Sequence, residues 1–446
     1  MIGDETWAAL SPDEKRQERF KRWLAPGTIR FSGPEAEKAY KTRVTRFIKA
    51  ICLEEPDRVP VQLPAGYVPA YYAGVDLKTV MYDYKELSRA WITFMHEFEM
   101  DAFTGPGLVY PAKVLEDIDY RLYLWPGHGL ADDVTAYQFV EGEYMKADEY
   151  DAFIGDPAGF LLTTYLPRTT RAFAGFRKLD SMASLIGVPI PFIARYGDPE
   201  VRESTRKLLE AALETMKWRD AVAHVTRAAL EAGLPSLSGT MSGAPFDRMG
   251  DALRGTKGIM MDMYRRPEKL LEAMERITPM IIEQGIRGAN ASECPIVRMP
   301  LHKGTGGFMS EKQFETFYWP TLKKVMMAYI NEGLVPMPFA EGDYEPRLDI
   351  ITDMPKGSVI WLFEVMDMAK AKRTVGAHAC IAGNLPVSIL CTGTPDDVKR
   401  GCRKLIETCA PGGGYILAGS AQVENGNPDN LRAMMAAAKE YGVYKK

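Results

Sequence analysis

The chain lacks the cysteine patterns that staple secreted proteins or form common zinc sites. Its six cysteines are scattered along 446 residues with no C-x-x-C spacing, and in a reducing compartment such cysteines remain free thiols. Burial as small apolar side chains is their usual use, although four fall after residue 379, which leaves a metal role open. The sequence also has no apolar run long enough to span a bilayer and no secretory signal at its start. These absences predict a cytoplasmic protein without a membrane segment.

A strong net charge is absent as well. Lys and Arg number 55 against 59 Asp and Glu, which gives a formal net charge of -4. Neither a nucleic-acid footprint nor a patch for anionic membranes is expected from this balance. Hydrophobic residues make up 46% of the chain, enough for a sizeable globular core. The expected partners are therefore small molecules or other proteins.

The order of apolar and amphipathic stretches predicts the fold. Charged stretches with apolar residues at helical spacing, 12–24 and 36–52, indicate a helical lead-in over 1–52. From 53 to 446, short apolar or β-branched runs end in Gly, Pro or polar residues and alternate with longer amphipathic stretches. The runs lie at 59–67, 101–107, 234–245, 294–304, 333–343, 358–367, 379–386 and 413–420. Eight such units predict an α/β fold, a (β/α)8 TIM barrel, and the missing G-x-G-x-x-G motif weighs against two doubly wound domains.

The spacing is uneven at one place. About 120 residues separate the second and third predicted strands, so we predict a large insertion at about 112–230. An insertion after the carboxyl end of a barrel strand sits on the face where barrels hold their active sites. A lid, a substrate cap and an interface for a homodimer all fit this position.

Several motifs resemble those of the uroporphyrinogen decarboxylase superfamily. They include PDRVPV, SGAPFDRMGDALRG, IAGNLPVSILCTGTPDDVKRGCRKLI and GGGYILAGSAQVENGNPDNL, and apart from the insertion the match runs from about residue 45 to the end. The resemblance implies a (β/α)8 barrel. Because the superfamily holds porphyrinogen decarboxylases and corrinoid-dependent methyltransferases, the fold alone does not choose a reaction.

The positions that carry porphyrinogen decarboxylation in the superfamily depart from its pattern here. The loop after the first strand reads LPAGYVPAYY, without the arginines that hold the substrate's carboxylates. The central Asp falls at Pro106, the Tyr falls near Asp251, and the late histidine falls in AGS at 418–420. Uroporphyrinogen is therefore not the expected substrate.

The chain resembles the methyltransferase branch of the superfamily more than the porphyrinogen decarboxylases. The zinc motif of that branch is nevertheless changed in this sequence. The H-x-C-G place of that branch falls on FAEG at 339–342, so that Glu341 lies in the motif. Its late Cys falls on Gly419 or Ser420. A zinc site that activates a thiol is therefore absent in its usual form.

Functional side chains of a barrel come from the carboxyl ends of its strands. We expect His302, Glu341 and Lys303 to carry catalysis, because a histidine before a glycine-rich loop and a carboxylate at a strand end suit acid or base chemistry. Glu341 and His302 are also candidate ligands of a zinc ion. The substrate-binding candidates are Arg298, Asp343, Tyr344, Glu364 and Asn384. Asp367 is expected to cap the helix that follows it.

His378 and Cys380 have the H-x-C spacing of zinc ligands. They precede the end of the seventh predicted strand, which places them at the bottom of the barrel or inside the strand. We expect them to be buried rather than to bind metal.

The resemblance and the polar strand ends together predict a methyltransferase. It would move a methyl group from a small O-, N- or S-methylated substrate to a corrinoid, and the lack of a D-x-H-x-x-G pattern places the corrinoid on a separate protein. The heteroatom leaves only when protonated or metal-bound, a task for His302 and Glu341. Two alternatives stay open: a decarboxylase or lyase of a small carboxylic acid held by Arg298 or Lys303, and a non-enzymatic carrier of a corrinoid or tetrapyrrole.

Overall fold

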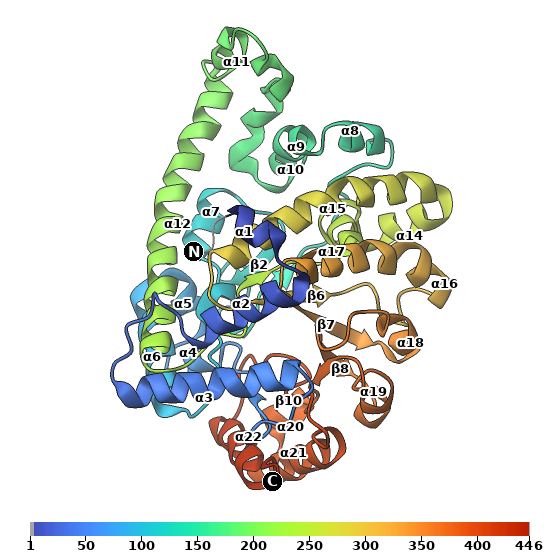
Figure 1. Cartoon of the computed structure of the whole chain (residues 1–446). Helices are drawn as coiled ribbons and strands as arrows, with labels where there is room; N and C mark the ends of the chain where they lie inside the picture. Colours follow the sequence, from blue (N-terminus) through green and yellow to red (C-terminus); the bar gives the residue numbers. More distant parts are fainter. Residues whose placement is uncertain (1–3, 446) are drawn as a thin grey trace.

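The fold is organised around a curled parallel sheet of seven strands, seen near the centre of Figure 1. The computed structural model describes residues 4–445. In spatial order the strands are β1 (Val61–Gln62), β10 (Tyr415–Ala418), β9 (Cys380–Ala382), β8 (Ile360–Val365), β7 (Val335–Asp343), β6 (Ile296–Leu301) and β5 (Thr240–Met241). Every pairing in this sheet is parallel, and helices link successive strands. The fold is therefore α/β and like a TIM barrel, as the spacing predicts.

The second predicted strand, 101–107, is replaced by a single bridge. Phe103 forms an isolated parallel bridge with Ser236, and its N–H donates to the carbonyl of Pro235 at 3.1 Å. On the other side, the carboxylate of Asp101 accepts the N–H of Val61 at 2.9 Å, in place of a backbone carbonyl. The segment thus lies between β1 and the region before β5, but its Gly and Pro residues do not continue a ladder.

Alternation along β6 separates the inside of the sheet from the outside. Val297, Met299 and Leu301 belong to the large core shared with the surrounding helices. Ile296 belongs to a second core, which contains Met337, Leu362, Ala382, Ile416 and aromatic residues of the N-terminal helices. Because side chains alternate along a strand, Arg298 faces the inside together with Ile296.

The N-terminal helices close one end of this inner core. They are α1 (Asp4–Ala9), α2 (Pro12–Leu24) and α3 (Pro34–Ile51), and α3 runs across the lower part of the molecule in Figure 1. A capping box formed by Ser11 and Glu14 starts α2. Phe20, Trp23 and Phe47 from these helices are buried against the strand residues.

The residues between the bridge at Phe103 and β5 form a separate group of elements. They include α7 (Ala112–Asp117), a small sheet of β2 (Tyr123–Pro126), β3 (Gly129–Leu130) and β4 (Gln138–Phe139), and the helices α8 (Tyr150–Gly155), α9 (Pro157–Phe160), α10 (Leu166–Thr169), α11 (Ile190–Arg195) and α12 (Pro199–Glu231). α12 is about 50 Å long and packs partly along α6 (Tyr84–Glu97). Its N-terminal half projects with α11 beyond the rest of the molecule (Figure 1) and exposes Leu209 and Leu213.

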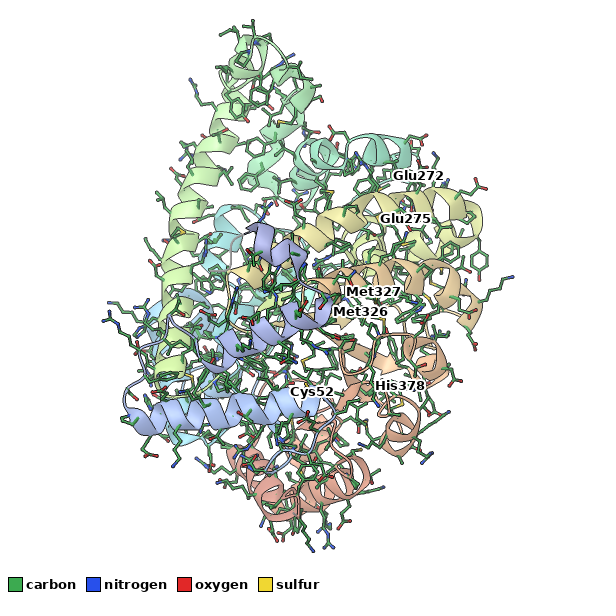
Figure 2. All side chains as sticks on the ribbon, in the orientation of Figure 1. Cys52, Glu272, Glu275, Met326, Met327 and His378 are labelled. Atoms are coloured by element: carbon green, nitrogen blue, oxygen red, sulfur yellow. The ribbon has the colours of Figure 1, made fainter. Side chains whose placement is uncertain are left out.

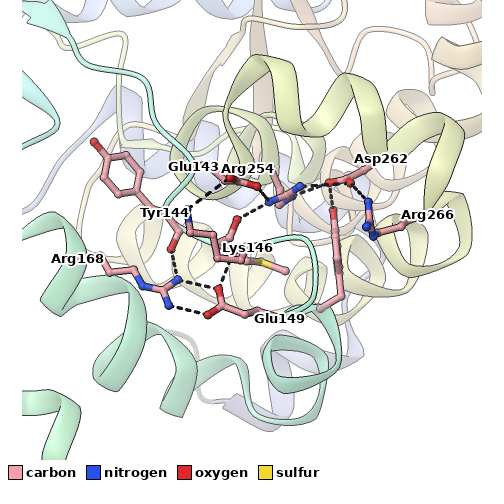
Figure 3. Close-up of polar contacts among 10 residues, drawn as sticks. Glu143, Tyr144, Lys146, Glu149, Arg168, Arg254, Asp262 and Arg266 are labelled. Carbon is pink, nitrogen blue, oxygen red and sulfur yellow. Dashed lines mark hydrogen bonds and ion pairs between the residues drawn. The ribbon is translucent and has the colours of Figure 1, made fainter.

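A charged network fixes this group of elements to the sheet-bearing part (Figure 3). Arg254 is buried and contacts Asp262 at 2.5 Å and Glu143 at 2.6 Å. The hydroxyl of Tyr150 donates to Asp262 at 2.9 Å. Because Arg254 ends the π-helical segment η5 (Arg248–Arg254), the network holds residues 143–150 beside that segment.

The remaining helices surround the sheet. They are α4 (Val68–Tyr72), α5 (Leu77–Tyr82), α13 (Pro245–Asp247), α14 (Gly255–Arg265), α15 (Pro267–Asn290), α16 (Glu311–Gln313), α17 (Trp319–Asn331), α18 (Leu348–Ile351), α19 (Met368–Thr374), α20 (Val387–Thr392), α21 (Pro395–Cys409) and α22 (Pro428–Tyr441). Asp367 caps α19 by accepting the N–H groups of Ala369 and Lys370, as predicted. Over residues 4–445, no helix combines the length and apolar character needed to cross a bilayer.

The cysteines are free thiols, and four of the six are buried. Cys52 follows α3 and is one of the two that are partly exposed (Figure 2). Cys380 is buried at the first residue of β9, at the opposite end of the strand from the predicted site. His378, labelled in the same figure, is exposed, so the expectation that it is buried is wrong.

Candidate active site

Five ionisable side chains gather where β5, β6 and β7 end. His302 and Lys303 follow the last residue of β6, and Glu341 lies near the end of β7. Asp247 and Asp251 come from α13 and η5, which follow β5. Parallel strands place their carboxyl ends at one edge, so three segments distant in sequence meet here.

Asp247 fixes the chain that leaves β6. Its carboxylate is 3% exposed and accepts the backbone N–H groups of His302 and Lys303, each at 3.0 Å. The hydroxyl of Tyr318 donates to the same carboxylate at 2.7 Å. Burial and the nearby charge of Asp251 raise the pKa of Asp247 to about 6. The positions of the two candidate catalytic residues that follow β6 therefore depend on one buried acid.

His302 lies between two carboxyl groups. Its Nδ1 is 2.6 Å from Oδ2 of Asp251, and its Nε2 is 3.7 Å from Oε1 of Glu341. Burial opposes the charged form of the ring, but the hydrogen bond with Asp251 and the neighbouring negative charges raise the pKa of His302 to about 9. At neutral pH the ring is an imidazolium, which carries protons on both nitrogens.

Glu341 is the other member of this pair. Burial raises its pKa to about 7; His302 opposes the shift, and Glu364, Asp247 and Asp251 add to it by repulsion. A carboxyl group with this pKa holds a proton in a large fraction of molecules at neutral pH. Its value is close to the pH at which a general acid is most effective.

Asp251 and Lys303 complete the cluster. Burial alone would raise the pKa of Asp251, but its contacts with His302 and Lys303 hold that pKa below its usual value. The ammonium group of Lys303 lies 3.0 Å from Asp251, 3.4 Å from Glu141 and 2.9 Å from the hydroxyl of Thr256. The ammonium group of Lys303 thus already has three polar partners. One of them, Glu141, belongs to the segment that precedes α8.

The other predicted site residues are divided by the structure. Glu364 and Asn384 lie at the ends of neighbouring strands: Glu364 accepts the N–H of Gly342 at 2.6 Å, and Asn384 donates to the carbonyl of Glu364 at 3.1 Å. Asp343 is exposed, and its carboxylate accepts the N–H of Glu345 within its own turn. Tyr344 is completely buried among aromatic side chains, so we propose no substrate contact for it.

Arg298 differs from the other charged residues of the predicted site. It is partly buried on the inner face of β6, four residues before His302. Within residues 4–445, its side chain forms neither an ion pair nor a hydrogen bond with another residue.

The sequence model of the family described as uroporphyrinogen decarboxylase (URO-D) matches residues 181–441. The chain belongs to the URO-D family. A uroporphyrinogen decarboxylase from Chlorobaculum parvum (strain DSM 263 / NCIMB 8327) is 24% identical over 190 residues, 40% of this chain and 51% of that protein. This chain therefore spans about half the length of that curated relative.

A solved structure of a methyltransferase from Methanosarcina mazei has a similar fold. The TM-score is 0.56 at 16% sequence identity, and the match covers 89% of this chain and 98% of that one. This likeness concerns the fold. The predicted family is confirmed by the family match.

Asp247 and Asp251 are the residues that the strand-end rule misses. Both lie in the URO-D-like motif SGAPFDRMGDALRG, and Asp251 falls near the place of the decarboxylase tyrosine. Their spacing of four residues puts them on one side of a helical turn. Two acids so spaced directly after a predicted strand are a signal that the sequence does contain.

The donor set does not fit the zinc ion implied by the URO-D methyltransferases. Zinc takes three or four protein ligands. Across residues 4–445, no group of three or more His, Cys, Asp or Glu side chains is arranged to hold a metal ion. Nδ1 of His302 contacts Asp251, which leaves Nε2 and Glu341 as a pair without a third ligand. We therefore derive no chemical step through a metal.

Proposed function

We propose that the protein is a methyltransferase that takes a methyl group from a small O-, N- or S-methylated compound and delivers it to a corrinoid on a separate protein. The observation that supports this most is the acid pair His302–Glu341. An imidazolium and a carboxyl group with a pKa of about 7 face each other across 3.7 Å at the ends of adjacent strands. URO-D family membership agrees with this choice.

The pair has a defined task in such a reaction. When the bond between the methyl carbon and the heteroatom breaks, the heteroatom keeps the electron pair and needs a proton. Glu341 donates that proton, and the imidazolium of His302 stabilises the carboxylate that is left. A reduced corrinoid bound to the partner protein would supply the electron pair for the new bond to the methyl carbon.

The rest of the cluster prepares this step. Asp251 holds His302 by Nδ1, so that Nε2 points toward Glu341. Asp247 fixes the backbone of His302 and Lys303. These groups act through the pair, so their role is positioning.

The test supplies purified protein with a reduced corrinoid protein and a panel of methoxylated compounds, methylated amines and thioethers. Formation of the demethylated product is measured by mass spectrometry. Glu341→Gln keeps the shape of the side chain but cannot donate a carboxylic proton, so we expect the rate to fall on the order of 10² to 10⁴-fold. Asp343→Asn, a matched change at an exposed carboxylate on the same strand, should leave the rate nearly unchanged.

The pH dependence gives a second readout. The acid form of Glu341 is present below its pKa and is lost above it, so the rate should fall as the pH rises through about 7. In Glu341→Gln this decline should disappear. Absence of methyl transfer from every compound, or full activity of Glu341→Gln, would contradict the proposal.

A decarboxylase or lyase of a small carboxylic acid is the second candidate. The unpaired Arg298 favours it, since a guanidinium on the inner face of the sheet suits a carboxylate. Turnover of such an acid without any corrinoid protein would favour this reaction over methyl transfer.

A further inference from the structure

Arg298 carries a charge that nothing in the described chain neutralises. Between residues 4 and 445, its guanidinium has no carboxylate within ion-pair distance and no hydrogen-bond acceptor. Burial lowers the pKa of Arg298, and no neighbouring charge contributes to the shift. A guanidinium nevertheless stays protonated in proteins. The residue is only partly buried and none of its nitrogens is among the buried polar atoms that lack a partner, so water solvates this charge in the free protein and an anionic ligand can replace that water.

The neighbours of Arg298 show that the inner face is open to solvent at this level. In the strand register Arg298 is opposite Met241 on β5 and Met337 on β7. Met337 is buried, whereas Met241 is 48% exposed. Phe339, two residues further along β7, is partly exposed as well. A small molecule that enters from the strand ends thus meets apolar side chains around one cation.

The distance to the acid pair sets the size of that molecule. Arg298 precedes His302 by four residues, which corresponds to about 13 Å along an extended strand. An arginine side chain directed along the strand toward His302 would cover part of this distance. A ligand with an anionic group at Arg298 therefore needs only a short spacer to bring a second group to His302 and Glu341.

Lys303 is not an equivalent anchor. Its ammonium group already contacts Asp251, Glu141 and Thr256. Any anion at Lys303 would have to displace a carboxylate, whereas an anion at Arg298 displaces none.

We propose that Arg298 binds a carboxylate of the substrate, so that the methyl donors of this protein are small methylated carboxylic acids. Arginine holds a carboxylate through two parallel hydrogen bonds, which also orients the ligand. The carboxylate end then lies deep on the inner face, and the methylated heteroatom lies at the acid pair. The identity of the reacting group rests on the proposed function; the carboxylate site does not.

The experiment measures binding to the full chain by calorimetry, without corrinoid. Two matched pairs serve as probes: 4-methoxybenzoate with 4-methoxybenzamide, and methoxyacetate with 2-methoxyacetamide. Inorganic phosphate at equal ionic strength is the third type of probe. In the unmodified protein at least one acid should bind about tenfold or more tighter than its amide.

Two variants separate a ligand anchor from a core residue. Arg298→Met removes the charge and should abolish the preference for the acid, while its melting temperature stays nearly unchanged because the guanidinium has no partner within the described chain to lose. Arg298→Lys keeps the charge but not the planar fork and should retain a weaker preference.

Several results would overturn the proposal. They are equal binding of acid and amide, no binding of either acid, and an unchanged preference in Arg298→Met. Phosphate binding tighter than that of both acids, and lost in Arg298→Met, would assign the site to phosphate instead. Acid binding that depends on Arg298, together with no methyl transfer, would leave this inference standing and refute the proposed function.

Discussion

Replacing Asp251 with asparagine should lower the pKa of His302 from about 9 toward its ordinary value of 6.5. Asparagine is of similar size, so the ring keeps its neighbours, but the negative charge at 2.6 Å from Nδ1 is removed. Asp247 and Glu341 remain and also raise this pKa. We therefore expect a value between 6.5 and 9 rather than a complete return.

The effect on stability is smaller than the full pKa difference suggests. A change from about 9 to 6.5 corresponds to about 3 kcal/mol for a pair shielded from water. The side chain of His302 is 45% exposed, and solvent screening weakens such pairs. We expect about 1 kcal/mol of lost stability from this contact.

The sign of the pH dependence follows from the raised pKa. A histidine whose folded-state pKa exceeds its unfolded value stabilises the fold fully below about pH 6.5 and loses that contribution as the pH rises through about 9. Asp251, whose pKa is lowered, is ionised throughout this range. The difference in unfolding free energy between the unmodified protein and Asp251→Asn should thus be larger at pH 6 than at pH 10. The contact of Lys303 with Asp251 adds to the difference at both pH values.

The assay is an NMR titration of the five histidine rings, with His302 assigned by its absence in His302→Gln. Urea unfolding at pH 6 and pH 10 gives the stability difference. Asp343→Asn is the control, because this carboxylate is exposed and lies outside the pair. A pKa of His302 near 9 in Asp251→Asn would refute the electrostatic account of the site.

Two further predictions concern buried charges outside the acid pair. Asp101 is 1% exposed, and its carboxylate accepts hydrogen bonds from Arg58 and from the backbone N–H of Val61. Asp101→Asn should therefore lower the free energy of urea unfolding by about 3–5 kcal/mol. A decrease below about 1 kcal/mol would show that the segment around Phe103 does not depend on this carboxylate. Arg254→Met should cost about 1–3 kcal/mol, because the buried Asp262 then keeps only Arg266 at 3.4 Å and the hydroxyl of Tyr150 as partners. Adding Asp262→Leu should recover part of the loss, and equal stability of the single and double variants would contradict this reasoning.

The strand pattern could be predicted from the sequence because it depends on local periodicity. Seven of the eight predicted runs contain a strand of the sheet, and 294–304 and 333–343 contain the two long ones, β6 and β7. The run at 101–107 does not form the predicted strand, for a reason that the periodicity of apolar residues does not reveal. There a buried carboxylate, Asp101, replaces a ladder acceptor, and such a contact depends on tertiary structure.

The end of β7 shows a second limit of the alternation rule. The register between β7 and β8 shifts between Ala340 and Asp343, and Gly342 has a φ of +78°, a backbone conformation that glycine adopts without strain. Beyond this bulge the chain turns, so Asp343 faces solvent and Tyr344 enters the core. Glu341 lies within this bulge and stays at the site. Tyr344, a predicted substrate-binding residue, thus belongs to the core. The turn that places it there is not revealed by the alternation of polar and apolar residues.

The electrostatic surroundings of Glu341 explain why a carboxyl group suits the place where the family resemblance puts a zinc motif. A zinc ligand must be deprotonated, whereas burial and, to a smaller extent, Glu364, Asp247 and Asp251 raise the pKa of Glu341 and favour a bound proton. Asp251, Asp247 and Glu341 in turn raise the pKa of His302 to about 9 against the effect of burial, so both members of the pair hold protons near neutral pH. In the methyl transfer that we propose, such a cluster would protonate the leaving heteroatom, and its proton-holding state follows from burial and repulsion among residues that the sequence places in three distant segments.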